Sequence, residues 1–164
     1  MAHRTPPLAS AADIDPTLFV PANELKKLRK TAGTLSVSEQ LLLAETEKQK
    51  GNEEFGTGDM ARALYYFTRS LQFAKQPHVL TNRALAFLRT KQYDHARQDC
   101  DAALLLDPDH FKAYLRRGIA CLRQHRMPEA IADFEHAAML DPDPNGEVHG
   151  LLQGAKDQYS STTR

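Results

Sequence analysis

The sequence predicts an all-α fold in which three pairs of helices stack side by side. A repeat of about 34 residues occurs three times, over residues 44–76, 77–110 and 111–144. Small side chains at three positions of each repeat would let two helices approach closely, and apolar side chains at two further positions would fill the space between them. Proline near the end of the second and third repeats would stop a helix, because it lacks an N–H donor and clashes with the preceding turn.

The repeats carry similar residue types at the positions where helices should pack. The aligned residues are Gly51, Ala84 and Gly118 at position 8, Phe87 and Cys121 at position 11, Ala63, Ala96 and Ala130 at position 20, Phe67, Cys100 and Phe134 at position 24, Ser70, Ala103 and Ala137 at position 27, and Pro108 and Pro142 at position 32. This pattern resembles the tetratricopeptide repeat, which implies a right-handed helical solenoid with the first helix of each repeat on the concave side. Three residues of the first repeat depart from the pattern, namely Glu47 in place of a bulky residue, Glu54 at position 11 and Lys75 in place of the proline.

The segments before the repeats differ from them in composition. Met1–Pro21 is rich in Pro, Ala, Thr and Ser and has no sustained periodicity, which predicts a disordered tail. Residues 22–36 are interpreted as a linker that could hold a short helix closed by Gly33. Residues 37–159 are interpreted as the repeat domain.

The first long helix is predicted to begin at a capping box. Ser36 would cap it while Glu39 reaches back to the backbone of Ser36, with Ser38 as the competing cap. The run Gly56-Thr-Gly-Asp59 should end this helix. A last helix over about 147–159 would cover the open apolar end of the solenoid. The other helices are expected over about 60–75, 77–90, 94–106, 111–124 and 128–140.

Composition restricts the classes of function. Charged residues make up 26% of the chain and the formal net charge is zero, so we expect no nucleic-acid partner and no membrane partner. No apolar run is long enough to span a membrane, and the first 15 residues lack a secretory apolar region, which favours a cytoplasmic location. The two cysteines stand at core positions and are expected to be buried and reduced. The seven histidines show no metal-ligand spacing, so we expect no metal, no cofactor and no enzyme.

Five polar residues recur at fixed offsets within the repeats and form the candidate site. Lys48 and Asn52 are four residues apart, as are Lys112 and Arg116, and residues four apart share one face of a helix. Asn82 stands one repeat after Lys48 and one repeat before Arg116. Three cations and two amides that converge in this way would make a receptor for carboxylates. Each residue taken alone could instead be solvated surface or a structural amide.

This set resembles the two-carboxylate clamp of co-chaperones. The matching runs are Lys-Gln-Lys-Gly-Asn from Lys48, Asn-Arg-Ala from Asn82, and Lys-Ala-Tyr-Leu-Arg-Arg from Lys112. The resemblance implies binding of the C-terminal Glu-Glu-Val-Asp of the cytosolic ninety- and seventy-kilodalton heat-shock proteins. Lys48, Asn52 and Asn82 would hold the terminal carboxylate and the last side chain, and Lys112 and Arg116 the peptide backbone and a side-chain carboxylate.

Three further residues follow Asn82 on the same helix, namely Leu85, Leu88 and Arg89. They would shape a pocket for an apolar residue of the tail, or else serve ordinary packing.

A second resemblance lies around the first repeat. Leu28–Gly33, Leu35, Glu47–Phe55 and Tyr65–Leu71 are similar to a repeat domain of the sperm-associated-antigen family, relatives of the RNA polymerase II-associated repeat proteins. That family implies a monomeric, non-enzymatic cytoplasmic adaptor that brings a heat-shock chaperone to client or assembly-factor proteins, including those of axonemal dynein. The alternative is a repeat scaffold that binds an internal peptide of a non-chaperone complex. The sequence does not distinguish the preferred chaperone or the client.

Overall fold

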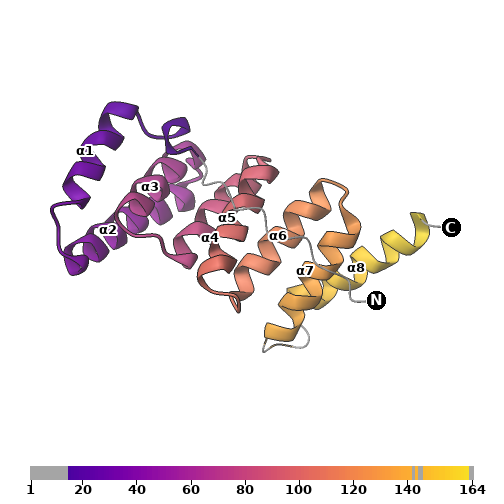
Figure 1. Ribbon diagram of the computed structural model, residues 1–164. Coiled ribbons are helices and arrows are strands. Elements are labelled where there is room, and N and C mark those ends of the chain that lie inside the picture. The colour runs from indigo at the N-terminus through magenta and orange to yellow at the C-terminus, as the bar shows by residue number, and fades with distance from the viewer. Residues whose placement is uncertain (1–14, 142, 144–145, 163–164) are drawn as a thin grey trace, which may run out of the picture.

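The computed structural model describes residues 15–141, 143 and 146–162 of the chain. These residues form helices and no strand, which confirms the predicted all-α fold (Figure 1). No helix in these ranges is long and apolar enough to cross a membrane. The elements are η1 (Pro16–Leu18), α1 (Ala22–Ala32), α2 (Val37–Thr57), α3 (Met60–Phe73), α4 (Pro77–Arg89), α5 (Tyr93–Leu106), α6 (Phe111–Arg123), α7 (Met127–Leu140) and α8 (Glu147–Thr162).

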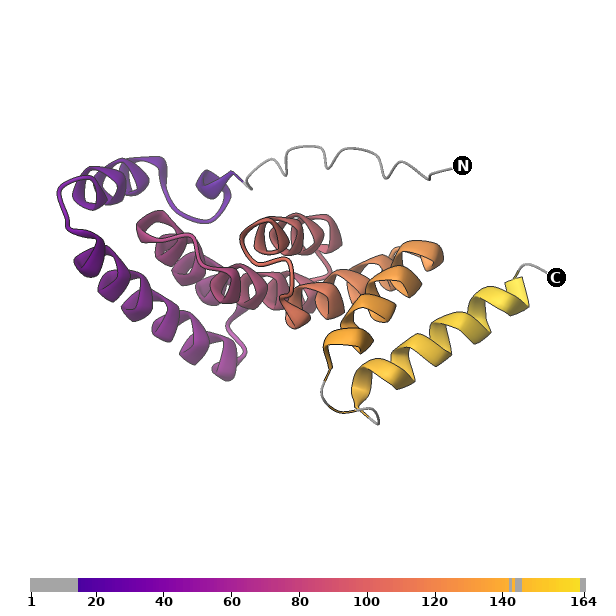
Figure 2. The same ribbon diagram turned by 60° about the horizontal axis from the view of Figure 1, so that its bottom comes forward.

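Six of these helices form the three pairs that the repeat predicts. α2 packs against α3, α4 against α5 and α6 against α7, and the pairs follow one another in chain order (Figure 1). α8 packs against α7 and lies at the C-terminal end of the row (Figure 2). It continues to Thr162, beyond the predicted end near residue 159.

The boundaries of α2 follow from local chemistry. The backbone N–H of Ser36 donates to the Glu39 carboxylate at 2.8 Å, and the backbone N–H of Glu39 donates to the Ser36 hydroxyl at 3.3 Å. This capping box makes Ser36, rather than Ser38, the cap. The helix ends at Gly58, whose φ of 89° lies in the left-handed region that glycine adopts at low cost.

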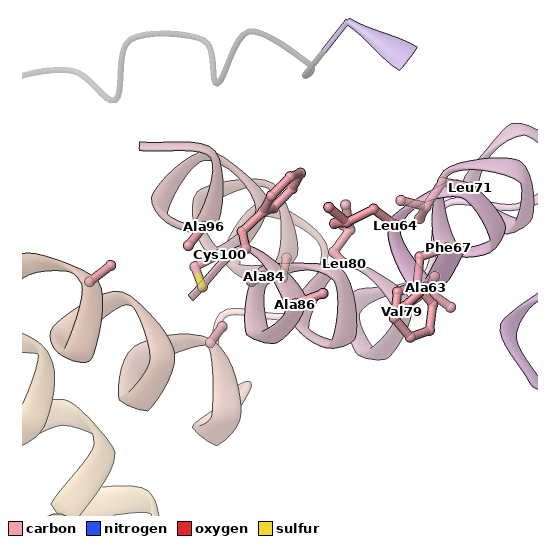
Figure 3. Close-up of a cluster of buried hydrophobic side chains, with 14 residues drawn as sticks. Ala63, Leu64, Phe67, Leu71, Val79, Leu80, Ala84, Ala86, Ala96 and Cys100 are labelled. Carbon is pink, nitrogen blue, oxygen red and sulfur yellow. The ribbon is translucent and has the colours of Figure 1, made fainter. Parts of the chain in front are cut away.

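The two helices of a pair touch where a small residue faces a ring. A Cβ added to Gly51 would stand 2.6 Å from the Phe67 ring, and one added to Gly118 would stand 2.6 Å from the Phe134 ring. The second pair has the smaller Cys100 at the ring position, and there position 8 is alanine in the same buried cluster (Figure 3). Position 8 is therefore glycine in the two pairs in which position 24 is phenylalanine, and alanine in the pair in which it is cysteine.

Ion pairs with buried aspartates join the helices of the second and third pairs. Arg83 donates to both oxygens of Asp99 at 2.8 and 2.7 Å, and Arg117 donates to Asp133 at 2.7 Å. The four residues occupy positions 7 and 23 of their repeats. Arg83 also donates to Thr68 at 3.0 Å, which ties the second pair to α3 of the first pair.

The N-terminal helix is fastened to the first pair by a polar network. Arg69 on α3 contacts Glu24 on α1 and Glu47 on α2, and Tyr65 donates to Glu24 at 2.6 Å. Glu47 is buried, and Lys50 is its second cationic partner at 3.0 Å. This network explains why glutamate occupies a position where the repeat usually has a bulky residue.

The end of Met1–Pro21, the segment that the sequence predicts as a disordered tail, is structured. Residues 1–14 of that segment lie outside the described residues. After them comes η1, and Val20 is fully buried in a cluster with residues of α1 and α3. Phe19 packs on Phe87, with ring centroids 5.4 Å apart. Apolar residues at the end of a Pro- and Ala-rich stretch are the signal that the composition argument overlooked.

The contact between Gly118 and Phe134 gives a test of the fold. Gly118→Ala should lower the free energy of unfolding by about 1–3 kcal/mol, because the fully buried Phe134 ring cannot move aside. Gly150→Ala on α8 is the matched control, since nothing lies within 4 Å of its added Cβ, and helix propensity alone should stabilise the protein by up to about 1 kcal/mol. Urea denaturation measures both changes. A stabilising Gly118→Ala would contradict the close packing.

Candidate peptide-binding groove

The five predicted site residues lie on the first helices of the three pairs. Lys48 and Asn52 are on α2, Asn82 is on α4, and Lys112 and Arg116 are on α6. Lys48 and Asn52 are about one helical turn apart, and so are Lys112 and Arg116. The three helices follow one another along the solenoid, so the set extends across all three repeats.

Three of the five side chains form a continuous hydrogen-bonded row. The side-chain amide of Asn82 donates to Oδ1 of Asn52 at 3.1 Å, and Arg116 donates to Oδ1 of Asn82 at 3.5 Å. The row connects α6 to α4 and α4 to α2. The side-chain oxygen of Asn82 thus faces Arg116, and its amide nitrogen faces Asn52. The amide nitrogen of Asn52 has no acceptor among the described residues, so it remains available as a donor.

Arg116 differs in its surroundings from the two structural arginines. Arg83 and Arg117 are each paired with an aspartate, whereas no described carboxylate lies within ion-pair distance of Arg116. Burial lowers the pKa of Arg116, although an arginine remains charged at neutral pH. A partly buried cation without an anionic partner is unfavourable, because it has lost part of its hydration. An anion supplied by a ligand would offset this cost.

Each lysine lies about one turn before a member of this row, Lys48 before Asn52 on α2 and Lys112 before Arg116 on α6. Lys112 is exposed on the first turn of α6 and makes no ion pair or hydrogen bond with any described residue. Lys48 contacts Glu45, one turn earlier on α2, at 2.6 Å. His78, on the first turn of α4, has its pKa lowered by burial and by the charge of Lys48.

A small pocket of about 130 Å³ opens beside the two asparagines. Asn52, Phe55, Phe67, Asn82 and Leu85 line it, so its wall combines three apolar side chains with two amides. We call this pocket together with the five polar residues the groove.

Of the three residues that the sequence suggested as shaping a pocket, one lines this pocket. Leu85 lies in it, whereas Leu88 and Arg89 are not among its lining residues. Phe55 and Phe67 were missed as site residues. The position of Phe55, one turn after Asn52 on α2, was a signal available in the sequence.

The remaining reactive groups do not suggest other chemistry. Burial raises the pKa of the Cys100 thiol, and it also raises the pKa of Cys121, so both thiols stay protonated. No cluster of three or more metal-ligating side chains is found among the residues that the structure describes.

Known sequences share the repeats of this chain. A family profile described as tetratricopeptide repeat matches residues 81–147. Sperm-associated antigen 1 of Mus musculus is 40% identical over 131 residues, which are 80% of this chain and 14% of that protein. RNA polymerase II-associated protein 3 of Xenopus laevis is 39% identical over 92 residues, which are 56% of this chain and 14% of that protein. The chain thus spans about a seventh of the length of these relatives.

Solved structures extend the similarity to the fold. The first repeat domain of Spaghetti (RPAP3), bound to the HSP90 peptide SRMEEVD, has a TM-score of 0.71 and 31% identity over 73% of this chain and 95% of that one. The second repeat domain of human RPAP3, in complex with the HSP70 peptide SGPTIEEVD, has a TM-score of 0.65 and 32% identity over 74% of this chain and 98% of that one. The chain belongs to the tetratricopeptide-repeat family, and its repeat domain is closely related to those of sperm-associated antigen 1 and RNA polymerase II-associated protein 3.

Proposed function

We propose that the chain is a co-chaperone adaptor whose groove binds the C-terminal Glu-Glu-Val-Asp tail of HSP90 or HSP70 chaperones. The observation that carries the proposal is Arg116, a partly buried cation with no described carboxylate partner, at one end of the row of amides. Support comes from the related domains that were solved with peptides ending in Glu-Glu-Val-Asp. In this reading the adaptor recruits a chaperone in the cytoplasm to assemble protein complexes.

The groove matches the chemistry of a free C-terminus. A terminal aspartate carries two carboxylates on one residue, which is twice the negative charge of an internal aspartate. Arg116 offers a planar fork of donors, Lys48 and Lys112 offer compact charges, and Asn52 offers a neutral donor. The valine before the aspartate is small and apolar, and the pocket of about 130 Å³ is a suitable size for it.

The expected affinity is moderate. Each charge-assisted hydrogen bond contributes about 1.5–3 kcal/mol. Ordering a flexible tail and losing translational freedom oppose this gain. A few such bonds, reduced by these costs, give a dissociation constant on the order of micromolar. This affinity suits a tail that docks and releases repeatedly.

The first test of the proposal is the dependence on a free carboxylate. A peptide ending in Glu-Glu-Val-Asp should bind about thirtyfold more tightly than its C-terminal amide, a difference of about 2 kcal/mol, because a charge-assisted contact becomes neutral. A version with one added glycine should also bind weakly, because the main-chain carboxylate moves away from the side-chain carboxylate. Fluorescence anisotropy measures all three. Equal affinities would reject the proposal and favour binding of an internal peptide.

The second test contrasts two neighbouring arginines. Arg116→Ala should weaken binding of the acid peptide by at least about 2 kcal/mol and change the melting temperature little, because no described carboxylate loses its partner. Arg117→Ala should destabilise the fold by about 3–5 kcal/mol, because it leaves the carboxylate of Asp133 buried without its cation. Calorimetry of binding and of unfolding separates the two effects. Unchanged peptide affinity in Arg116→Ala would contradict the proposed site.

A further inference from the structure

Lys48, the first cation of the groove, already holds a carboxylate from the same chain. Its ammonium nitrogen lies 2.6 Å from Oε1 of Glu45 and 2.7 Å from Oε2. Glu45 is three residues earlier on α2, which places both side chains on one face of the helix. The Lys48 side chain is only 16% exposed, whereas that of Glu45 is 55% exposed.

Lys48 lies one turn before Asn52 on the same face of α2, and Asn52 accepts a hydrogen bond from Asn82 on α4 at 3.1 Å. His78 on α4 experiences both charges, since Lys48 lowers its pKa and Glu45 acts in the opposite direction. His78 also occupies position 2 of the second repeat, as Lys112 does in the third. The carboxylate of Glu45 is therefore on the groove side of the molecule, beside the lysine that would meet the C-terminus of a peptide.

The fold does not depend on Glu45. Its neighbour Glu47 is buried and also contacts Arg69, so it belongs to the network that fastens α1. Glu45 has no partner other than Lys48 among the described residues, and more than half of its side chain faces water. The pair is weakened from the Glu45 side, because water competes for the exposed carboxylate and the long side chains lose freedom when they pair. Glu45 can therefore release Lys48 when another anion arrives.

We propose that Glu45 is an internal competitor for Lys48 that lowers the affinity of the groove for a C-terminal carboxylate. This inference rests on the proposed function. An incoming carboxylate must either displace Glu45 or share Lys48 with it, and a shared lysine brings two negative charges close together. Both routes reduce the net gain from Lys48. The cost falls mainly on the lifetime of the complex, because changes within one interface act chiefly on dissociation.

The experiment compares Glu45→Gln with Glu129→Gln. Glu129 pairs with Arg126 at 2.7 Å at the same three-residue spacing and is 48% exposed, but it lies on α7, outside the groove. Both variants remove one negative charge. We measure dissociation constants by fluorescence anisotropy for peptides ending in Glu-Glu-Val-Asp, as the free acid and as the amide.

The acid peptide should bind Glu45→Gln about two- to fivefold more tightly than wild type, and Glu129→Gln should match wild type. The amide should gain less from Glu45→Gln, because it lacks the terminal charge that competes. In a Lys48→Ala background the gain should disappear, which shows that it acts through Lys48.

The outcomes separate the two proposals. If wild type prefers the acid over the amide but Glu45→Gln binds no more tightly, the groove stands and the competitor role is wrong. Weaker binding by Glu45→Gln would instead make Glu45 a residue that positions Lys48. If wild type binds neither peptide, the proposed function is wrong and the inference fails with it.

Discussion

The arginine–aspartate pairs at positions 7 and 23 set the geometry on which the groove depends. Arg83 and Arg117 turn inward from α4 and α6 toward Asp99 and Asp133 on the following helices. This contact fixes how each first helix is rotated about its own axis. The residue before each arginine then points about 100° away, as helical geometry requires. That residue is Asn82 on α4, and Arg116 is its counterpart on α6.

The same constraint explains why neighbouring cations in one helix behave differently. Arg117 keeps its charge in a partly buried place because, although burial opposes ionisation, Asp133 and Asp101 raise its pKa. Arg116, one residue earlier, has only the oxygen of an amide as a partner. Arg117 is thus paired with carboxylates within the fold, whereas Arg116 has no carboxylate partner among the described residues. The zero net charge of the chain does not reveal this division, because it sums paired and unpaired charges.

The spacing of the repeat was enough to predict the fold, because it repeats the residues at which paired helices touch. Glycine at position 8 and phenylalanine at position 24 meet in this way in the first and third pairs. It also placed Asn52, Asn82 and Arg116 on helices that the structure brings together. The network around Glu47 could not be predicted from the repeat, because its partners come from a helix outside the repeat pattern. The polar row depends on rotamers and on the direction of each amide, which a sequence does not encode by spacing alone.

The N-terminal segment alters how the array can come apart. In a linear array each unit contacts only its neighbours, so the terminal helices fray first. Here Val20 is buried beside α1 and α3, while the adjacent Phe19 packs on Phe87 of the second pair. The segment therefore acts as a clip across two units and couples their opening. The helix that carries Lys48 and Asn52 is the first of the array, and the clip gives it protection that an end position would otherwise lack.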